Sequence, residues 1–340
     1  MSTSNKKPYF LTMCLKLPAL FRRKPAGYPP PPLLQLPPEL ILTICDHLAT
    51  DPASRCSLAM ACKYLFAVLS RNGKPPPLEM GSRNSFLSLL ERDLGERFYL
   101  CCSCSKLRRF DKSWGPTRPD RSCAAKSNSV FSEGNYRLGY HHVRLVMNYH
   151  RSGGTKGIPP KNLNQTAWVQ TFDIFKRRPG GLWCQTWSAL VISNELFLSV
   201  QHTLQARTDK QLRQALATSS YAICPHIDIN QMPGSRPWGL RPAPLEDRDL
   251  EACWEFPGSC SRCLTDYILT IERPQASAGH SKRGGCRISI TSFHQLGDGM
   301  SPDDWKWEAY RGSRPTSGPV RDVQECPAGL IMETWNSGHP

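Results

Sequence analysis

The feature that most constrains this fold is a short stretch, residues 34–69, that carries two helix start signals. Pro37–Pro38 can open a helix, because proline supplies a helical φ in the first turn, where its missing N–H has no partner. Asp51–Pro52 pairs a capping residue with a second first-turn proline. The stretch therefore predicts at least two short helices.

Apolar residues follow both start signals at intervals of three and four, which places them on one face of each helix. They are Leu40, Ile41, Ile44, Cys45 and Leu48 in the first predicted helix, and Leu58, Ala61, Cys62, Leu65, Val68 and Leu69 in the second. A unit of about 35 residues is smaller than the roughly 40 below which a domain seldom stands alone. We therefore expect the downstream chain or another protein to cover these faces.

The order of these residues resembles a known family. Leu36-Pro37-x-Glu39-Leu40, then Ile44 and Leu48, then Leu58-Ala59-x-x-Cys62-Lys63-x-Leu65, is similar to the F-box as it occurs in a large group of fungal F-box proteins. The resemblance implies that the stretch binds the Skp-type adaptor of a cullin-RING ubiquitin ligase and that the remaining chain recruits a protein substrate. The residues carried over as adaptor-binding are Leu36, Pro37, Leu40, Ile44, Leu48, Leu58, Cys62 and Leu65. The alternative is an ordinary helical hairpin inside one core.

The chain of 340 residues has room for more than one domain. We expect an α+β protein with a small N-terminal helical F-box and a β-rich domain with some helix. The predicted divisions are a disordered basic, proline-rich tail over residues 1–32, an F-box over 33–70, a linker over 71–85 and a cysteine-containing substrate-binding domain over 86–335.

The residue types and their spacing predict several helices and strands in the last domain. Trp183 to Val191 and Glu195 to His202 are rich in β-branched and aromatic residues, so they predict a hairpin with a tight turn at Ser193-Asn194. The other predictions are helices over 86–94 and after Thr208 or Asp209, strands over 264–272 and 287–291 joined by a long loop over 274–285, and a half-buried strand over 303–308.

Paired cysteines suggest a metal site. Cys101/Cys104 and Cys260/Cys263 are C-x-x-C turns, and two intervening residues let both thiolates reach one zinc ion. Four thiolates would form a closed structural zinc site that these two turns share. Cys224 and His226 are weaker candidates for metal ligands.

Other readings of the cysteines stay open. A disulfide framework is disfavoured in an unsecreted chain, and a redox C-x-x-C would need a thioredoxin-like βαβ context. Inert thiols are the main alternative, and we assign Cys14, Cys45, Cys56, Cys62, Cys184, Cys286 and Cys326 to that class. The family resemblance extends to the early C-x-x-C, the Cys-Pro-His and the late stretch 258–267, without implying how the cysteines pair.

The formal net charge of +15 raises the question of a nucleic-acid partner. Its densest clusters are Arg22-Arg23-Lys24, Lys106 to Arg109, Lys176 to Arg178 and Lys282-Arg283, and none is interleaved with aromatic residues on a recognisable nucleic-acid fold. We expect a non-catalytic protein-binding role, with nucleic acid unlikely. The alternative is a zinc-containing basic nucleic-acid-binding or general protein-interaction protein.

No catalytic residue is predicted. Residues 153–157 lack the ending of a phosphate-binding loop, His141-His142 fit a surface or an edge strand, and nothing in the sequence orients His226 as a base for Cys224. No run of about 18 apolar residues occurs, and the N-terminal apolar stretch is a poor signal-peptide core. We therefore expect a cytoplasmic or nuclear protein.

Overall fold

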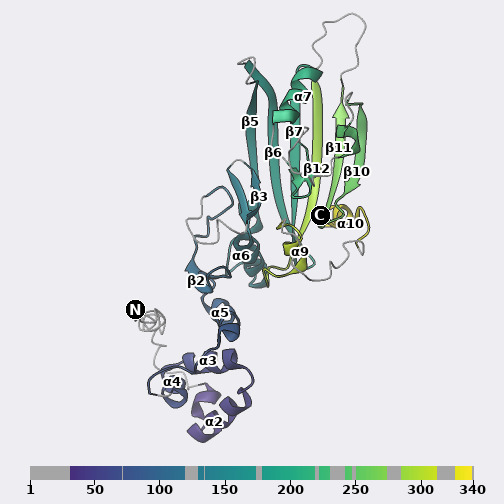
Figure 1. The fold of residues 1–340 in the computed structure, drawn as a ribbon. Helices are drawn as coiled ribbons and strands as arrows, with labels where there is room; N and C mark the ends of the chain where they lie inside the picture. Colours follow the sequence, from purple (N-terminus) through teal and green to yellow (C-terminus); the bar gives the residue numbers. More distant parts are fainter. Residues whose placement is uncertain are drawn as a thin grey trace, which may run out of the picture. The chain divides into compact units, whose positions relative to one another are not determined.

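The computed structural model describes residues 31–70, 72–118, 129–133, 135–173, 178–218, 222–229, 242–246, 250–273, 285–311 and 326–338. The chain divides into two compact units, an N-terminal unit of residues 1–82 and a C-terminal unit of residues 83–340. The first is helical and the second is rich in strands, so the predicted α+β class is confirmed (Figure 1). The predicted tail lies outside the described residues up to position 30.

The N-terminal unit contains η2 (Pro32–Gln35), α2 (Pro38–His47), α3 (Pro52–Met60) and α4 (Lys63–Leu69). A helix begins at each of the two predicted start signals. Asp51 caps α3, since its carboxylate accepts hydrogen bonds from the backbone N–H groups of Ala53 at 3.1 Å and Ser54 at 3.2 Å. The predicted second helical run forms two short helices, because α4 begins after Cys62, whose Sγ accepts a hydrogen bond from the Leu65 N–H at 3.4 Å.

The boundary between the two units falls within α5 (Met80–Leu94), so part of the predicted linker is helical. The remaining elements, in chain order, are β1 (Phe98–Cys101), β2 (Lys106–Arg109), β3 (Ser129–Glu133), β4 (Tyr136–Gly139), α6 (Tyr140–Arg151), η3 (Pro160–Leu163), β5 (Gln165–Asp173), β6 (Arg178–Ile192), β7 (Glu195–Ala206), α7 (Asp209–Thr218), β8 (Ala222–Cys224), β9 (Ile227–Asp228), α8 (Ala243–Glu246), β10 (Cys253–Ser259), β11 (Thr265–Glu272), β12 (Cys286–Gly297), α9 (Trp305–Glu308) and α10 (Leu330–Ser337).

A six-stranded antiparallel sheet dominates this unit, with the strand order β10-β11-β12-β7-β6-β5. The predicted hairpin is confirmed as β6 and β7. Its turn residues Ser193 and Asn194 have φ values of 50° and 62°, the left-handed pair that a two-residue type I′ turn requires. The predicted strands after residues 264 and 287 are β11 and β12, and most of the loop between them lies outside the described residues.

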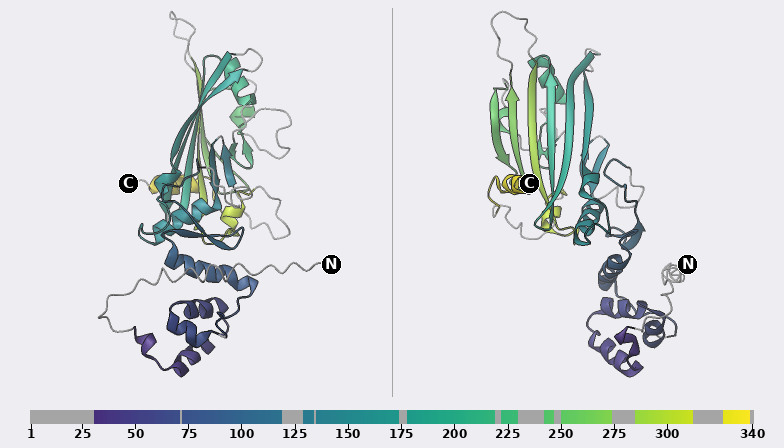
Figure 2. Two further views of the ribbon diagram at one scale, coloured as in Figure 1. Left: turned by 90° about the vertical axis from the view of Figure 1, so that its left-hand side faces the viewer. Right: turned by 180° about the vertical axis from the view of Figure 1, so that it is seen from behind.

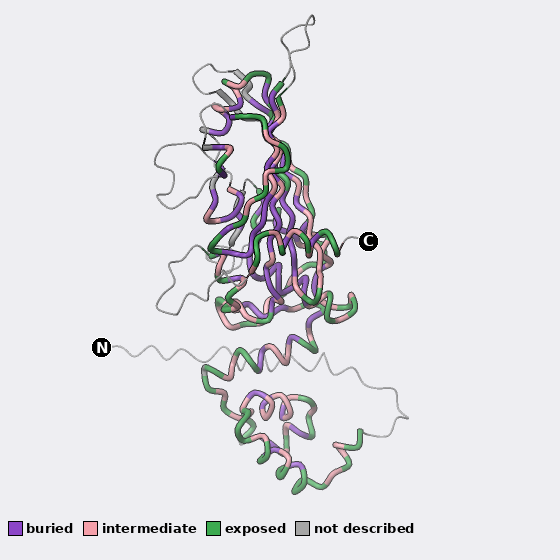
Figure 3. The backbone as a smooth tube through the Cα atoms, turned by 90° about the vertical axis from the view of Figure 1, so that its right-hand side faces the viewer, coloured by how far each residue is buried: buried purple, intermediate pink, exposed green. Residues whose placement is uncertain are grey.

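The two faces of the sheet are covered differently (Figure 2). Residues from α6 and α7 pack with one face in the main core, whereas Ile331 and Trp335 of α10 pack on the other face against Phe197 and Phe293. Alternate residues of a strand point to opposite faces, so β7 contributes to both cores. Figure 3 shows buried residues concentrated along the strands of this sheet.

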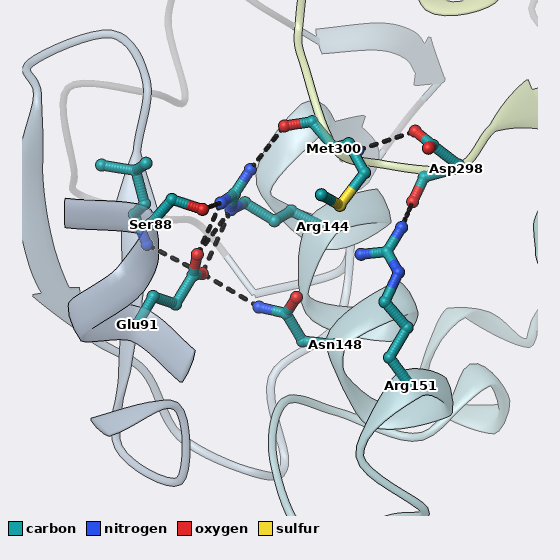
Figure 4. Close-up of polar contacts among 8 residues, drawn as sticks. Ser88, Glu91, Arg144, Asn148, Arg151, Asp298 and Met300 are labelled. Carbon is teal, nitrogen blue, oxygen red and sulfur yellow. Dashed lines mark hydrogen bonds and ion pairs between the residues drawn. The ribbon is translucent and has the colours of Figure 1, made fainter. Parts of the chain in front are cut away.

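A buried ion pair anchors α5 within the C-terminal unit (Figure 4). Arg144 Nη2 of α6 lies 2.6 Å from Glu91 Oε2 of α5, and the two side chains are only 4% and 5% exposed. Glu91 also accepts hydrogen bonds from the Leu100 N–H at 3.0 Å and Asn148 Nδ2 at 2.9 Å. Arg144 Nη1 also donates a hydrogen bond to the Met300 carbonyl oxygen at 2.9 Å. The pair thus joins helices α5 and α6 to strand β1 and to the loop at Met300.

Two local predictions are wrong. The predicted strand over 303–308 is the short helix α9, because the Asp304 carboxylate accepts a hydrogen bond from the Lys306 N–H at 3.1 Å and starts a helical turn. His141 and His142 are not surface or edge-strand residues but are buried in α6. There His142 Nδ1 accepts a hydrogen bond from the Gly139 N–H at 3.1 Å, which ties the ring to the start of the helix.

None of the helices in the described part of the chain is both long enough and apolar enough to cross a membrane.

Candidate metal centre

Two tight turns of the C-terminal unit supply the cluster of metal-ligating side chains. Cys224 ends β8, and His226 lies in the turn that leads to β9. Cys260 and Cys263 lie in the turn between β10 and β11, which is closed by two 2.8 Å backbone hydrogen bonds, from the Cys260 N–H to the Thr265 carbonyl and from the Thr265 N–H to the Cys263 carbonyl. Each turn therefore presents a pair of ligands from a fixed backbone.

The four ligand atoms lie close enough together to share one ion. All of them are within 4.8 Å of one another, and Cys260 Sγ is 3.7 Å from His226 Nδ1. Around zinc, with bonds of about 2.3 Å to sulfur and about 2.0 Å to nitrogen, tetrahedral ligands are separated by roughly 3.5–3.8 Å. A small contraction of the cluster would therefore satisfy the tetrahedral geometry, and four protein ligands would complete the coordination sphere of the ion.

The surroundings of the cluster favour negative charge on the sulfur of Cys260 but oppose it on Cys224 and Cys263. The three cysteines are buried and His226 is half-buried. Backbone N–H groups of Arg262 and His226 donate to Cys260 Sγ and Cys224 Sγ, each at 3.4 Å, as in the outer shell of structural zinc sites. Hydrogen bonds from the side chains of Cys224 and Cys263 lower the pKa of Cys260, whereas burial raises the pKa values of Cys224 and Cys263.

The structure brings together only part of the predicted four-thiolate site. Cys260 and Cys263 are joined by Cys224 and His226, the weaker candidates, and not by the Cys101/Cys104 pair. The Sγ atom of Cys104 instead accepts a hydrogen bond from Arg108 Nε at 3.4 Å, within the β1–β2 hairpin. The sequence left the pairing of the cysteine turns open. In the described part of the chain, the β8–β9 and β10–β11 turns bring the ligand atoms of Cys224, His226, Cys260 and Cys263 within 4.8 Å of one another.

The predicted adaptor-binding residues fall into three groups by exposure. Pro37 and Leu40 are exposed, and Leu65, at 1% exposure, belongs to the internal core of the N-terminal unit and is not available to a partner. Sequence reasoning missed the exposed apolar residues Leu42 and Tyr64, whose position off the helical stripe was the available signal. The half-buried group comprises Leu36, Ile44, Leu48, Leu58 and Cys62.

No protein-family model, curated protein or solved structure matches this chain.

Proposed function

We propose that this chain is a substrate adaptor of a ubiquitin ligase, in which the N-terminal unit binds a Skp-type adaptor and the C-terminal unit binds a protein substrate. The chain itself has no catalytic role in this proposal. It would hold the substrate near a ubiquitin-charged enzyme supplied by the ligase, so that the rate gain comes from a high local concentration.

The observation that carries the proposal is a separate helical unit with a small core and exposed apolar side chains. The buried core residues of this unit are Ile41, Cys45, Ala59, Leu65 and Leu69. Leu40, Leu42 and Tyr64 are 50%, 45% and 39% exposed. A core this small gives marginal stability on its own, and a partner that covers exposed leucines would add burial energy of about 25 cal/mol per Å² of apolar surface.

Leu40 and Leu42 allow a direct test. They lie on either side of the buried Ile41, so Leu40→Asp with Leu42→Asp changes the surface of α2 without opening the core. We expect the wild-type chain to co-elute with a co-expressed Skp-type adaptor in size-exclusion chromatography and the double variant to elute alone. Leu330→Asp, at a leucine 42% exposed in the C-terminal unit, is the matched control and should retain the complex.

Two spectroscopic measurements monitor the folding of the variants. All nine tryptophans lie between Trp114 and Trp335, so tryptophan fluorescence reports on the C-terminal unit alone. Circular dichroism reports on both units through their helices. A complex that survives the double substitution would contradict the proposal, and loss of the native tryptophan spectrum in that variant would indicate a helical hairpin that is part of one core.

We also propose that the Cys224/His226/Cys260/Cys263 cluster holds structural zinc, because three thiolates and one imidazole are a typical donor set for this ion. Elemental analysis of the purified chain should give one zinc per molecule. Cys263→Ser should abolish the zinc, whereas Cys104→Ser, the matched control in the other C-x-x-C turn, should leave it in place. Equal loss in both variants would favour the four-thiolate site predicted from the sequence.

A further inference from the structure

The β1–β2 hairpin and its flanks form a strongly basic segment of the C-terminal unit. Residues 97–118 contain six basic residues and one acidic residue, a net charge of +5 out of +15 for the whole chain of 340 residues. The acidic residue is Asp111, whose carboxylate accepts hydrogen bonds from the Ser113 N–H at 2.8 Å and from Ser113 Oγ at 2.7 Å. Five of the six basic side chains are exposed: Arg97, Lys106, Arg109, Lys112 and Arg118.

Neighbouring segments bring further charges to this surface. Asn162 Nδ2 donates to the Lys112 carbonyl oxygen at 2.7 Å, which places Lys161 beside the hairpin flank, and the Arg137 N–H donates to the Pro116 carbonyl oxygen at 2.9 Å. Asp93 and Glu96, exposed acidic residues, precede the segment. The balance remains positive, so the surface favours an anionic partner.

Within the described residues, β2 also has a hydrogen-bonding edge without a strand partner. Its ladder partner in the described part of the chain is β1, with Phe98 opposite Arg109 and Leu100 opposite Leu107. The Phe110 N–H bonds the Arg97 carbonyl oxygen at 3.1 Å, and hydrogen-bonded pairs alternate with non-bonded pairs in an antiparallel ladder. The backbone N–H and C=O groups of Leu107 and Arg109 therefore face away from β1, as in a strand that can accept another strand.

The aromatic side chains of the segment are not available for stacking with bases. The Arg109 guanidinium lies over the Phe98 ring, 5.8 Å from its centroid. Tyr99 is fully buried, and Phe110 and Trp114 are half-buried against the main core. Binding of single-stranded nucleic acid depends on exposed aromatic platforms as well as positive charge. An extended polypeptide needs only the free strand edge and the charges.

We propose that the free edge of β2 binds an extended acidic segment of a partner polypeptide, added as a third strand beside Leu107 and Arg109. Its carboxylates would be neutralised by Lys106, Arg109 and the basic flanks, while its backbone would pair with the outward-facing groups of β2. The proposal rests on the proposed function in one respect. It identifies the acidic segment of the partner as part of the substrate that the C-terminal unit recruits.

The test measures fluorescence anisotropy of a labelled octapeptide of alternating glutamate and valine, titrated with the full chain at low and physiological salt. No Skp-type adaptor is present, so failure here is separate from failure of the adaptor interaction. We expect saturable binding that weakens as salt rises. Lys106→Glu with Arg109→Glu should reduce the affinity about tenfold or more, because four units of charge change beside the ligand.

Two further variants sharpen the test. Arg207→Glu with Lys210→Glu changes the charge equally at two exposed residues next to and within α7, and should change the affinity less than about twofold. Leu107→Pro keeps every charge but removes an outward N–H at a position where an edge strand tolerates proline. It should also weaken binding, with circular dichroism and tryptophan fluorescence confirming the fold.

Several results would overturn the proposal. They are the absence of measurable peptide binding by the wild-type chain, equal binding by both charge-reversal variants, or equally tight binding of a lysine–valine octapeptide. Tighter binding of a 20-nucleotide oligo(dT), lost in the Lys106/Arg109 variant, would assign the surface to nucleic acid instead.

Discussion

Substitution of Arg144 by methionine should strongly destabilise the C-terminal unit. The side chain of Arg144 makes hydrogen bonds with both carboxylate oxygens of Glu91, at 2.6–3.1 Å, in a site that is almost fully buried. Burial opposes the charge of Arg144, but the hydrogen bonds and the charge of Glu91 outweigh it and raise the pKa of the guanidinium. Methionine fills a similar volume and leaves Glu91 as a buried charge without its cation.

The expected magnitude follows from the geometry of the pair. Removing one partner of a buried ion pair costs about 3–5 kcal/mol. The free energy of unfolding of a domain is about 5–15 kcal/mol in total, so the loss is a large fraction of it. At about 2–4 °C per kcal/mol for a unit of this size, the melting temperature should fall by roughly 6–20 °C. Urea unfolding followed by tryptophan fluorescence measures the change in the C-terminal unit specifically.

The double variant Glu91→Gln/Arg144→Met separates charge from packing. Glutamine keeps an acceptor for the Leu100 N–H, which lies 3.0 Å from Glu91 Oε1 in the wild-type chain, but carries no charge. We therefore expect it to recover most of the stability lost by Arg144→Met alone. If Arg144→Met were as stable as the wild type, or if the double variant were less stable than the single one, the buried pair would not anchor α5 as described.

Three further outcomes are expected. Asp266→Ala should lower the free energy of unfolding by about 1–3 kcal/mol in urea, because the buried carboxylate accepts hydrogen bonds from the Ile331 and Met332 N–H groups at the start of α10; an unchanged value would show that this helix docks without it. Burial lowers the pKa of His202 to about 3, so this ring contributes stability above pH 6.5 that is lost as the pH falls, about 2 kcal/mol by pH 5. His202→Gln should reduce the dependence of the unfolding free energy on pH between 6.5 and 4, and an identical slope would refute the assignment. Chelation of the proposed zinc ion should lower the melting temperature of the wild-type chain but not that of Cys263→Ser, and equal shifts in both chains would show that the chelator acts elsewhere.

Elements with local signals could be predicted from the sequence. Helices α2 and α3 begin where proline and Asp51 mark a first turn, and the hairpin turn at Ser193-Asn194 is specified by two residues of the chain. Such signals act within four residues, so they need no knowledge of the rest of the fold. The hydrophobic alternation of β11 and β12 has the same local character.

The features that were missed depend on tertiary neighbours. Alternation of Trp305 and Trp307 with charged residues is compatible with a strand or with one turn of helix, and the cap from Asp304 decides between them. The composition of the metal cluster depends on which turns meet in the core, and a C-x-x-C spacing contains no information about that. Cys260 and Cys263, and Cys224 with His226 as weaker candidates, could therefore be identified individually, while their grouping into one cluster required the structure.

The strand order of the large sheet has a consequence for the synthesis of the chain. Strands β7 and β12 are neighbours in the middle of the sheet, yet β7 ends at Ala206 and β12 begins at Cys286. A nascent or truncated chain that stops before residue 286 therefore has the β5–β6–β7 meander with the inner edge of β7 unpaired. Unpaired edges of long strands recruit other chains, so such products should aggregate or be degraded rather than accumulate as partly functional domains.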